Sequence, residues 1–97
     1  MYRIIEGRGT GKTRRLMEEA KKCQGTIVCY NPRAMEEKAK AYGIVGITFI
    51  SYTEFLGHGR GREAGTFFID EMECFARAAV AYSGVLGNFG GYTLSLE

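Results

Sequence analysis

The residues best suited to chemistry form a glycine-rich segment near the start of this 97-residue chain. Gly7–Thr13, with the sequence GRGTGKT, follows a β-rich stretch and precedes an amphipathic one. Glycine lets a backbone curl until several N–H groups point at one anion, and a helix that begins where the loop ends adds its positive terminus. Lys12 can reach the outer phosphates of a nucleotide, and the Thr13 hydroxyl can ligate Mg²⁺. The segment therefore predicts a phosphate-binding loop.

An acidic pair forms the second candidate. Thr66–Ile69 is an apolar stretch typical of a buried strand, and Asp70 and Glu71 follow it directly. We expect these carboxylates to lie near Thr13, because ligands in open α/β sheets bind beyond the carboxyl ends of the strands. Asp70 would then hold Mg²⁺, directly or through water, and Glu71 would orient and polarise an attacking water. Without the glycine loop, the same pattern would indicate only a strand followed by an acidic helix start.

The pattern of apolar residues predicts the elements that must position these side chains. Apolar or β-rich stretches predict strands at residues 2–6, 26–30, 47–50, 66–69 and 92–96. Helical spacing predicts helices at residues 12–23, 32–42 and 72–80, and the glycines of residues 57–65 predict a loop. Strands that alternate with helices over short connections indicate one α/β domain spanning residues 1–97. We expect a three-layer α/β/α arrangement with a mostly parallel sheet of about five strands.

Particular residues are expected to begin, end and bury these elements. Asn31 and Pro32 should begin the second helix, and Gly43 should end it. Ser51 or Thr53 should cap a short helical turn. The predicted buried stripes are Leu16, Met17, Ala20 and Cys23 on the first helix, Met35, Ala39 and Tyr42 on the second, and Met72, Phe75, Ala76, Ala79 and Val80 on the third.

Composition narrows the class of protein. Hydrophobic residues make up 45% of the chain and charged residues 25%, which excludes a disordered chain. A net charge of +2 is too small to argue for nucleic-acid or membrane binding by itself, and no apolar run is long enough to span a bilayer. Three cysteines without CxxC spacing disfavour a disulfide framework and a zinc site. We therefore expect a cytoplasmic protein with no membrane partner.

The two candidate motifs resemble those of P-loop NTPases. Gly7–Thr13 resembles the Walker A motif, with Glu6 standing where that motif has its first glycine, and Thr66–Glu71 resembles the Walker B motif. A glutamate directly after the Walker B aspartate, here Glu71 after Asp70, is typical of the additional-strand (ASCE) branch of P-loop NTPases, which the chain resembles in this respect. RecA-like ATPases, AAA+ proteins and helicases belong to that branch. The resemblance implies a P-loop NTPase-like fold.

The middle of the chain resembles superfamily 1 helicases more loosely. Residues 26–32 and 47–52 are similar to segments of the first RecA-like domain of those enzymes. In the additional-strand branch, the strand after Walker B lies between the loop strand and the Walker B strand. The resemblance therefore implies that residues 92–96 form this inserted strand, with Thr93 or Ser95 as a sensor of the γ-phosphate.

The resemblance also implies a function. A nucleoside triphosphate, ATP or GTP, would bind with Mg²⁺ and be hydrolysed, with a link to nucleic acid left open. The alternative is a non-hydrolysing nucleotide-binding module that regulates or docks a partner protein. Lys12 and Glu71 are the predicted catalytic residues, and Thr13 and Asp70 are the predicted metal ligands. The predicted nucleotide contacts are Gly7, Arg8, Gly9, Thr10, Gly11, Lys12, Thr13 and Arg14.

A second copy or a partner subunit is a further expectation. Residues 2–6 would form an edge strand that carries Ile4 and Ile5, and such edges are usually covered. Arg60 or Arg62 would be candidates for an arginine finger in a neighbouring subunit or for a contact with nucleic acid, although a solvated loop is the simpler interpretation.

Overall fold

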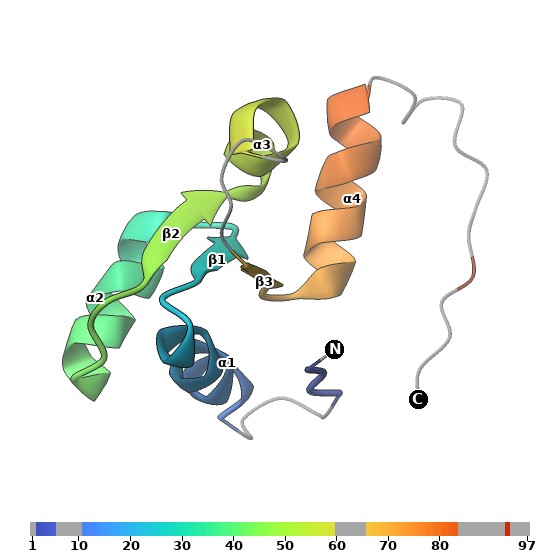
Figure 1. Cartoon of the computed structure of the whole chain (residues 1–97). Helices are drawn as coiled ribbons and strands as arrows, with labels where there is room; N and C mark the ends of the chain where they lie inside the picture. The colour runs from blue at the N-terminus through green and yellow to red at the C-terminus, as the bar shows by residue number, and fades with distance from the viewer. Residues whose placement is uncertain (1, 6–10, 60–65, 84–92, 94–97) are drawn as a thin grey trace.

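The computed structural model of the chain describes residues 2–5, 11–59, 66–83 and 93 (Figure 1). Within them, three parallel strands form a sheet in the order β2-β1-β3. The central strand β1 (Thr26–Cys29) pairs with β2 (Thr48–Ser51) on one side and with β3 (Phe67–Ile69) on the other. The helices are α1 (Lys12–Lys22), α2 (Pro32–Tyr42), the short α3 (Tyr52–Glu54), the π-helix η1 (Phe55–Gly59) and α4 (Met72–Ser83). The predicted α/β class and parallel sheet are confirmed.

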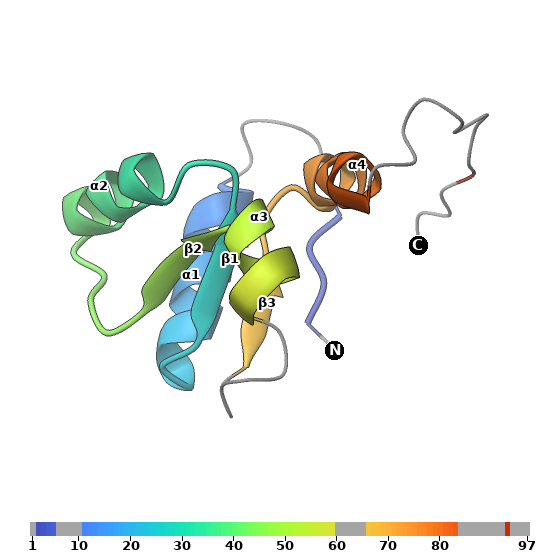
Figure 2. The same ribbon diagram turned by 90° about the horizontal axis from the view of Figure 1, so that it is seen from above.

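Helices cover both faces of the sheet. Side chains of a strand point alternately to opposite faces. Ile27 and Cys29 point to the face covered by α1 and α2, and they form one core with residues of both helices and the following loop: Met17, Ala20, Met35, Ala39 and Ile44. Figures 1 and 2 show α4 on the other side of the strands from α2.

Aromatic rings join α3, η1 and α4 to the second face. The Phe55 ring lies edge-on to Phe67 of β3, with their centroids 4.8 Å apart, and 5.9 Å from Phe75 of α4. Tyr52 meets Phe75 in the same manner at 5.7 Å. These contacts fix the start of α4 against the carboxyl end of β3.

The predicted ends of α2 are confirmed. The Asn31 side chain accepts a hydrogen bond from the Ala34 N–H at 3.2 Å, and Pro32 occupies the first turn. Gly43 ends the helix in the left-handed conformation, at φ 75°. Tyr42, however, is 38% exposed rather than buried, because it lies at the last turn and faces the start of α1 instead of the sheet.

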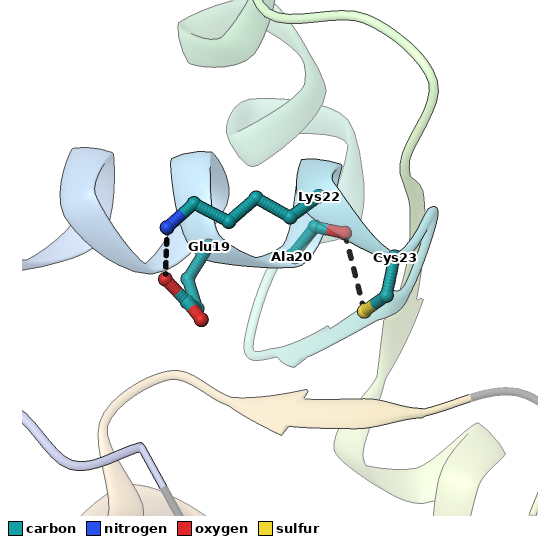
Figure 3. A network of polar contacts seen from close by, with 4 residues as sticks. All are labelled: Glu19, Ala20, Lys22 and Cys23. Carbon is teal, nitrogen blue, oxygen red and sulfur yellow. Dashed lines mark hydrogen bonds and ion pairs between the residues drawn. The ribbon is translucent and has the colours of Figure 1, made fainter.

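The end of α1 differs from its predicted pattern (Figure 3). Cys23 is exposed, although the apolar spacing placed it on the buried stripe. Its φ of −119° takes the chain off the helical path after Lys22, so the helical spacing no longer fixes where its side chain points. The thiol lies 3.6 Å from the Ala20 carbonyl oxygen, and the Lys22 ammonium pairs with Glu19 at 3.1 Å.

A helical turn replaces the first part of the predicted loop. Ser51 accepts a hydrogen bond from the Glu54 N–H, and the Glu54 carboxylate accepts one from the Ser51 N–H, which forms a capping box. Of the two predicted caps, Ser51 is therefore the residue used. The turn continues as the π-helix η1 through residues 57–59, and Phe55 at the start of η1 packs on Phe67. The remainder of the predicted loop, residues 60–65 with Arg60 and Arg62, lies outside the described residues.

The described residues form a sheet with fewer strands than predicted. Residues 2–5 form no strand, and Tyr2 and Ile5 are 44% and 43% exposed. Their β-rich composition favours an extended chain, but a strand also needs a hydrogen-bonded neighbour. The expected neighbour, residues 92–96, lies outside the described residues except for Thr93, which is in no helix or strand. Self-association was expected because residues 2–6 would form an exposed edge strand. Within the described residues 2–5 there is no such strand.

The apolar face predicted for α4 is only half-buried. Phe75, Ala79 and Val80 are partly covered, whereas Met72 is 54% exposed and Ala76 is also exposed. The reason is that α4 contacts the rest of the described chain through its first turns, at Phe75. None of the described helices is long and apolar enough to cross a membrane.

Candidate functional site

The start of α1 forms one side of the candidate site. Gly11 precedes the helix in the left-handed conformation, at φ 78°, which glycine adopts without strain. Its carbonyl accepts the first helical hydrogen bond, from the Arg15 N–H at 3.1 Å. Glycine has no side chain that could cap the helix, and no acidic residue occupies the first turn. The first-turn N–H groups and the ammonium of Lys12 therefore give this end of α1 a positive character.

The carboxyl end of β3 forms the opposite side. The Asp70 N–H donates to the Val28 carbonyl at 3.0 Å and so extends the pairing of β3 with β1 by one residue. The buried Tyr52 hydroxyl lies 2.7 Å from the Asp70 carbonyl oxygen and 3.3 Å from that of Glu71. The Phe75 N–H also donates to the Glu71 carbonyl, at 3.0 Å. The backbone that carries both carboxylates is thus held by β1, α3 and α4 together.

Glu71 has an unusual backbone conformation. Its φ is +60°, in the left-handed region that non-glycine residues rarely adopt. Such a conformation persists only where surrounding contacts impose it, and these residues cluster at functional sites. Here the contacts are the hydrogen bonds from Tyr52 and Phe75 to the Glu71 carbonyl.

One hydrogen bond joins the two sides of the site. The Thr13 hydroxyl donates to the Asp70 carboxylate at 3.2 Å, between residues 57 positions apart in sequence. We expected the acidic pair near Thr13 because the carboxyl ends of parallel strands lie at one edge of a sheet. The hydrogen bond places Asp70 directly beside Thr13. Two hard oxygen donors are therefore adjacent at the start of α1.

A cleft of about 270 Å³ opens beside this pair. Its lining comes from the start of α1, from the end of β3 and from the last turns of α2: Gly11, Lys12, Thr13, Arg14, Lys38, Tyr42 and Glu71. The Arg14 guanidinium lies 5.0 Å from the centre of the Tyr42 ring and 3.6 Å from the Glu18 carboxylate. The Tyr42 contact ties α1 to α2, and the ion pair within α1 helps to hold Arg14 at the cleft wall.

Burial and nearby charges act on Asp70 in opposite directions. Burial raises the pKa of its carboxyl and Glu71 adds to the rise, while the Thr13 hydrogen bond and the charges of Lys38 and Lys12 lower it. The net result is a raised pKa, so the ionised carboxylate is unfavourably desolvated. A bound cation would relieve that cost.

Two neighbouring groups stay protonated at neutral pH. Burial, and then the charge of Asp70, raises the pKa of the Cys29 thiol to about 11, against a weaker opposing hydrogen bond from the Asn31 backbone. Burial also raises the pKa of the Tyr52 hydroxyl far above its usual value. Tyr52 therefore remains a hydrogen-bond donor to the acidic turn, and Cys29 is a packing residue rather than a nucleophile.

The structure brings together most of the predicted site residues that it describes. Gly11, Lys12, Thr13 and Arg14 line one cleft together with Glu71, and Asp70 is hydrogen-bonded to Thr13 of that lining. The predicted contacts Gly7, Arg8, Gly9 and Thr10 lie outside the described residues. Among the described residues, no group of three or more His, Cys, Asp and Glu side chains gathers as a metal cage, so oxygen ligands for a metal would come from the Thr13–Asp70 pair.

Three residues of the site were not predictable from their positions in the sequence: Lys38, Tyr42 and Tyr52. Lys38 and Tyr42 are separated by one helical turn of α2, so they share a face, but only the contact of α2 with α1 brings that face to the cleft. The Tyr52 hydroxyl holds the backbone of the acidic turn at the Asp70 carbonyl. The position of Tyr52 directly after Ser51 does not show that its hydroxyl reaches the end of β3.

Comparisons with known proteins give no relative. No protein-family model, no curated protein and no solved structure matches the chain. What the protein does must therefore be inferred from the chemistry of the cleft.

Proposed function

We propose that the chain binds a nucleoside triphosphate, ATP in the first instance, together with Mg²⁺ at the cleft between α1 and β3, and hydrolyses it. The observation that carries the proposal is the 3.2 Å hydrogen bond from Thr13 to Asp70. It links the end of a glycine-rich loop, at a helix start, to an acidic residue at the end of a parallel strand. This pairing combines a phosphate-binding terminus with oxygen donors for a cation.

The positive end of α1 would bind the phosphates. Helix N-termini bind phosphate through their free N–H groups and the helix dipole. Lys12 adds a full charge at this end, and its partly buried position beside the cleft suits contact with the outer phosphates. The glycine at position 11 leaves the backbone accessible to a ligand that approaches closely.

The Thr13–Asp70 pair fits Mg²⁺ in its donor chemistry. This ion prefers oxygen ligands and usually takes one or two from protein, with the remainder from phosphates and water. A hydroxyl and a carboxylate 3.2 Å apart provide such a set. When bound, the ion would neutralise charge on the phosphates.

Glu71 would serve hydrolysis. Its exposed side chain lines the cleft beside Asp70, where it could accept a hydrogen bond from a water aimed at the terminal phosphate. Lys12 would stabilise the charge that develops as that phosphate is transferred. Fixing the Glu71 backbone through Tyr52 and Phe75 would limit how far the carboxylate can move away.

Calorimetric titration with ATP and Mg²⁺ tests binding. Lys12→Ala should abolish detectable binding and leave the circular dichroism spectrum unchanged, because Lys12 lies at the cleft and contributes charge. Lys21→Ala is the matched control, since it removes the same charge from the exposed last turn of the same helix. Equal affinity in the wild type and in Lys12→Ala would reject phosphate binding at this site.

Phosphate release tests hydrolysis separately. Glu71→Gln keeps the size of the side chain but removes the charge that polarises water, so turnover should fall by a factor of about 10² to 10⁴ with ATP affinity retained. Unchanged turnover in this variant would reject the role of Glu71. A wild type that binds ATP and releases no phosphate would favour the non-hydrolysing module instead.

A further inference from the structure

A lysine from a different helix shares the cleft with the candidate phosphate-binding residues. Lys38 lies on α2, 26 residues after Lys12 in sequence, and lines the same cavity as Lys12, Thr13 and Glu71. Its charge also reaches Asp70 across the cleft. No carboxylate in the described part of the chain forms an ion pair with Lys38, whereas Arg14 is paired with Glu18 and covers Tyr42.

We propose that Lys38 is a second phosphate-binding cation, which contacts the terminal phosphate of the bound nucleotide and lets the cleft distinguish a triphosphate from a diphosphate. This inference rests on the proposed function. Lys12, at the helix start, contacts phosphates common to both nucleotides as well as the terminal one, whereas Lys38 contacts the terminal phosphate alone. Lys38 lines the same cleft from α2 together with Glu71, which would position the water that attacks the terminal phosphate.

The charges that line the cleft support a phosphate-binding role for Lys38. Three cationic side chains, Lys12, Arg14 and Lys38, line it with one carboxylate, Glu71. Arg14 is paired with Glu18, so Lys12 and Lys38 are the lining charges that a triphosphate, only partly neutralised by one Mg²⁺, would complement.

The distance that Lys38 must span is compatible with its side chain. The Arg14 guanidinium, in the first turn of α1, lies 5.0 Å from the centre of the ring of Tyr42, the residue one turn after Lys38 on α2. The two helices are thus close enough at this end for long side chains to meet across the cleft. Lysine has a flexible four-carbon stem and can move its ammonium toward a ligand.

The experiment compares ATP and ADP binding, each with Mg²⁺, by calorimetric titration. The variants are Lys38→Met, which keeps the stem but loses the charge, and Lys38→Arg, which keeps the charge. Lys40→Met is the matched control, because Lys40 is exposed on the same helix and does not line the cleft. Thermal melting of each variant establishes that it is folded.

Lys38→Met should weaken ATP binding by about ten-fold to a hundred-fold, the usual effect of losing a hydrogen bond to a charged group. ADP binding should weaken by much less. Lys38→Arg should retain most of the ATP affinity, and Lys40→Met should differ from the wild type by less than about two-fold.

Three results would overturn the inference. Equal ATP affinity in Lys38→Met and the wild type would remove Lys38 from the site while leaving the proposed function intact. An equal loss for ATP and ADP would show that Lys38 does not read the terminal phosphate. A wild type that binds neither nucleotide would reject the proposed function and the role of Lys38 with it.

Discussion

Glycine at position 71 should make the protein more stable than glutamine there, although both changes remove the same carboxylate. Glu71 has a φ of +60°, and its carbonyl is fixed by hydrogen bonds from Tyr52 and Phe75. A left-handed conformation costs a residue with a Cβ about 1–2 kcal/mol, a cost that glycine does not have. Glutamine keeps the strain, whereas glycine releases it.

The expected difference follows from two opposing effects. Glycine relieves about 1–2 kcal/mol of strain but loses about 0.5–1 kcal/mol through the greater freedom of the unfolded chain, so the net gain is centred on about 0.75 kcal/mol. In a domain of this size, such a gain raises the melting temperature by about 3–6 °C. Thermal melting followed by circular dichroism of Glu71→Gly and Glu71→Gln measures it.

The matched control is the same pair of substitutions at Glu73. This residue lies on the first turn of α4 and has ordinary helical geometry, so glycine there should be less stable than glutamine, by up to about 1 kcal/mol. The sign of the glycine effect should therefore reverse between positions 71 and 73. If Glu71→Gly melts at or below the temperature of Glu71→Gln, the backbone at this residue is not strained.

Three further substitutions test the burial, hydrogen bonding and packing described above. Burial raises the pKa of the Asp70 carboxyl, so the ionisation of Asp70 lowers the free energy of unfolding once the pH rises above the ordinary carboxyl range. Urea denaturation at pH 7 should therefore show that Asp70→Asn is more stable than the wild type. That advantage should shrink below about pH 4, where the carboxyl is protonated in both states, and an advantage independent of pH would contradict the burial of a charge. Tyr52→Phe should lower the free energy of unfolding by about 1–3 kcal/mol, since it leaves the Asp70 carbonyl without its 2.7 Å partner; a loss near zero would mean that water replaces the hydroxyl. Gly25→Ala should destabilise by about 1–3 kcal/mol in the same assay, because a Cβ would lie 2.7 Å from the Phe68 ring and 2.9 Å from the Thr66 carbonyl, and a neutral result would mean that the loop can shift.

The sequence predicted those helix ends and strands that depend only on residues close together in the chain. Asn31 and Gly43 bound α2 as expected, because a side-chain cap and a left-handed glycine act within a few residues. The strands β1 and β3 were recognisable because a strand buried on both faces is apolar throughout. The proximity of Thr13 and Asp70 followed from the topology of a parallel sheet.

Features that depend on tertiary packing were not predictable from the sequence. Residues 2–5 have β-rich composition, but composition does not provide the neighbouring strand that a sheet requires. Tyr42 has the helical spacing of a core residue, and only the approach of α1 explains why Arg14 covers it at the surface. Lys38 was indistinguishable in sequence from the other lysines of α2, because its role depends on which face of that helix borders the cleft.

The most direct test of nucleotide binding at the start of α1 is an NMR titration of the ¹⁵N-labelled protein with ATP and Mg²⁺. The largest shifts should occur at the amides of Gly11, Lys12 and Thr13, while those of Gln24 and Gly25, beyond the far end of α1, should stay constant. Replacing Mg²⁺ by paramagnetic Mn²⁺ should broaden Thr13 and Asp70 first, since they are the proposed ligands. Saturating ATP that leaves the Gly11–Thr13 amides unmoved, or Mn²⁺ that broadens a different region, would contradict the proposed site.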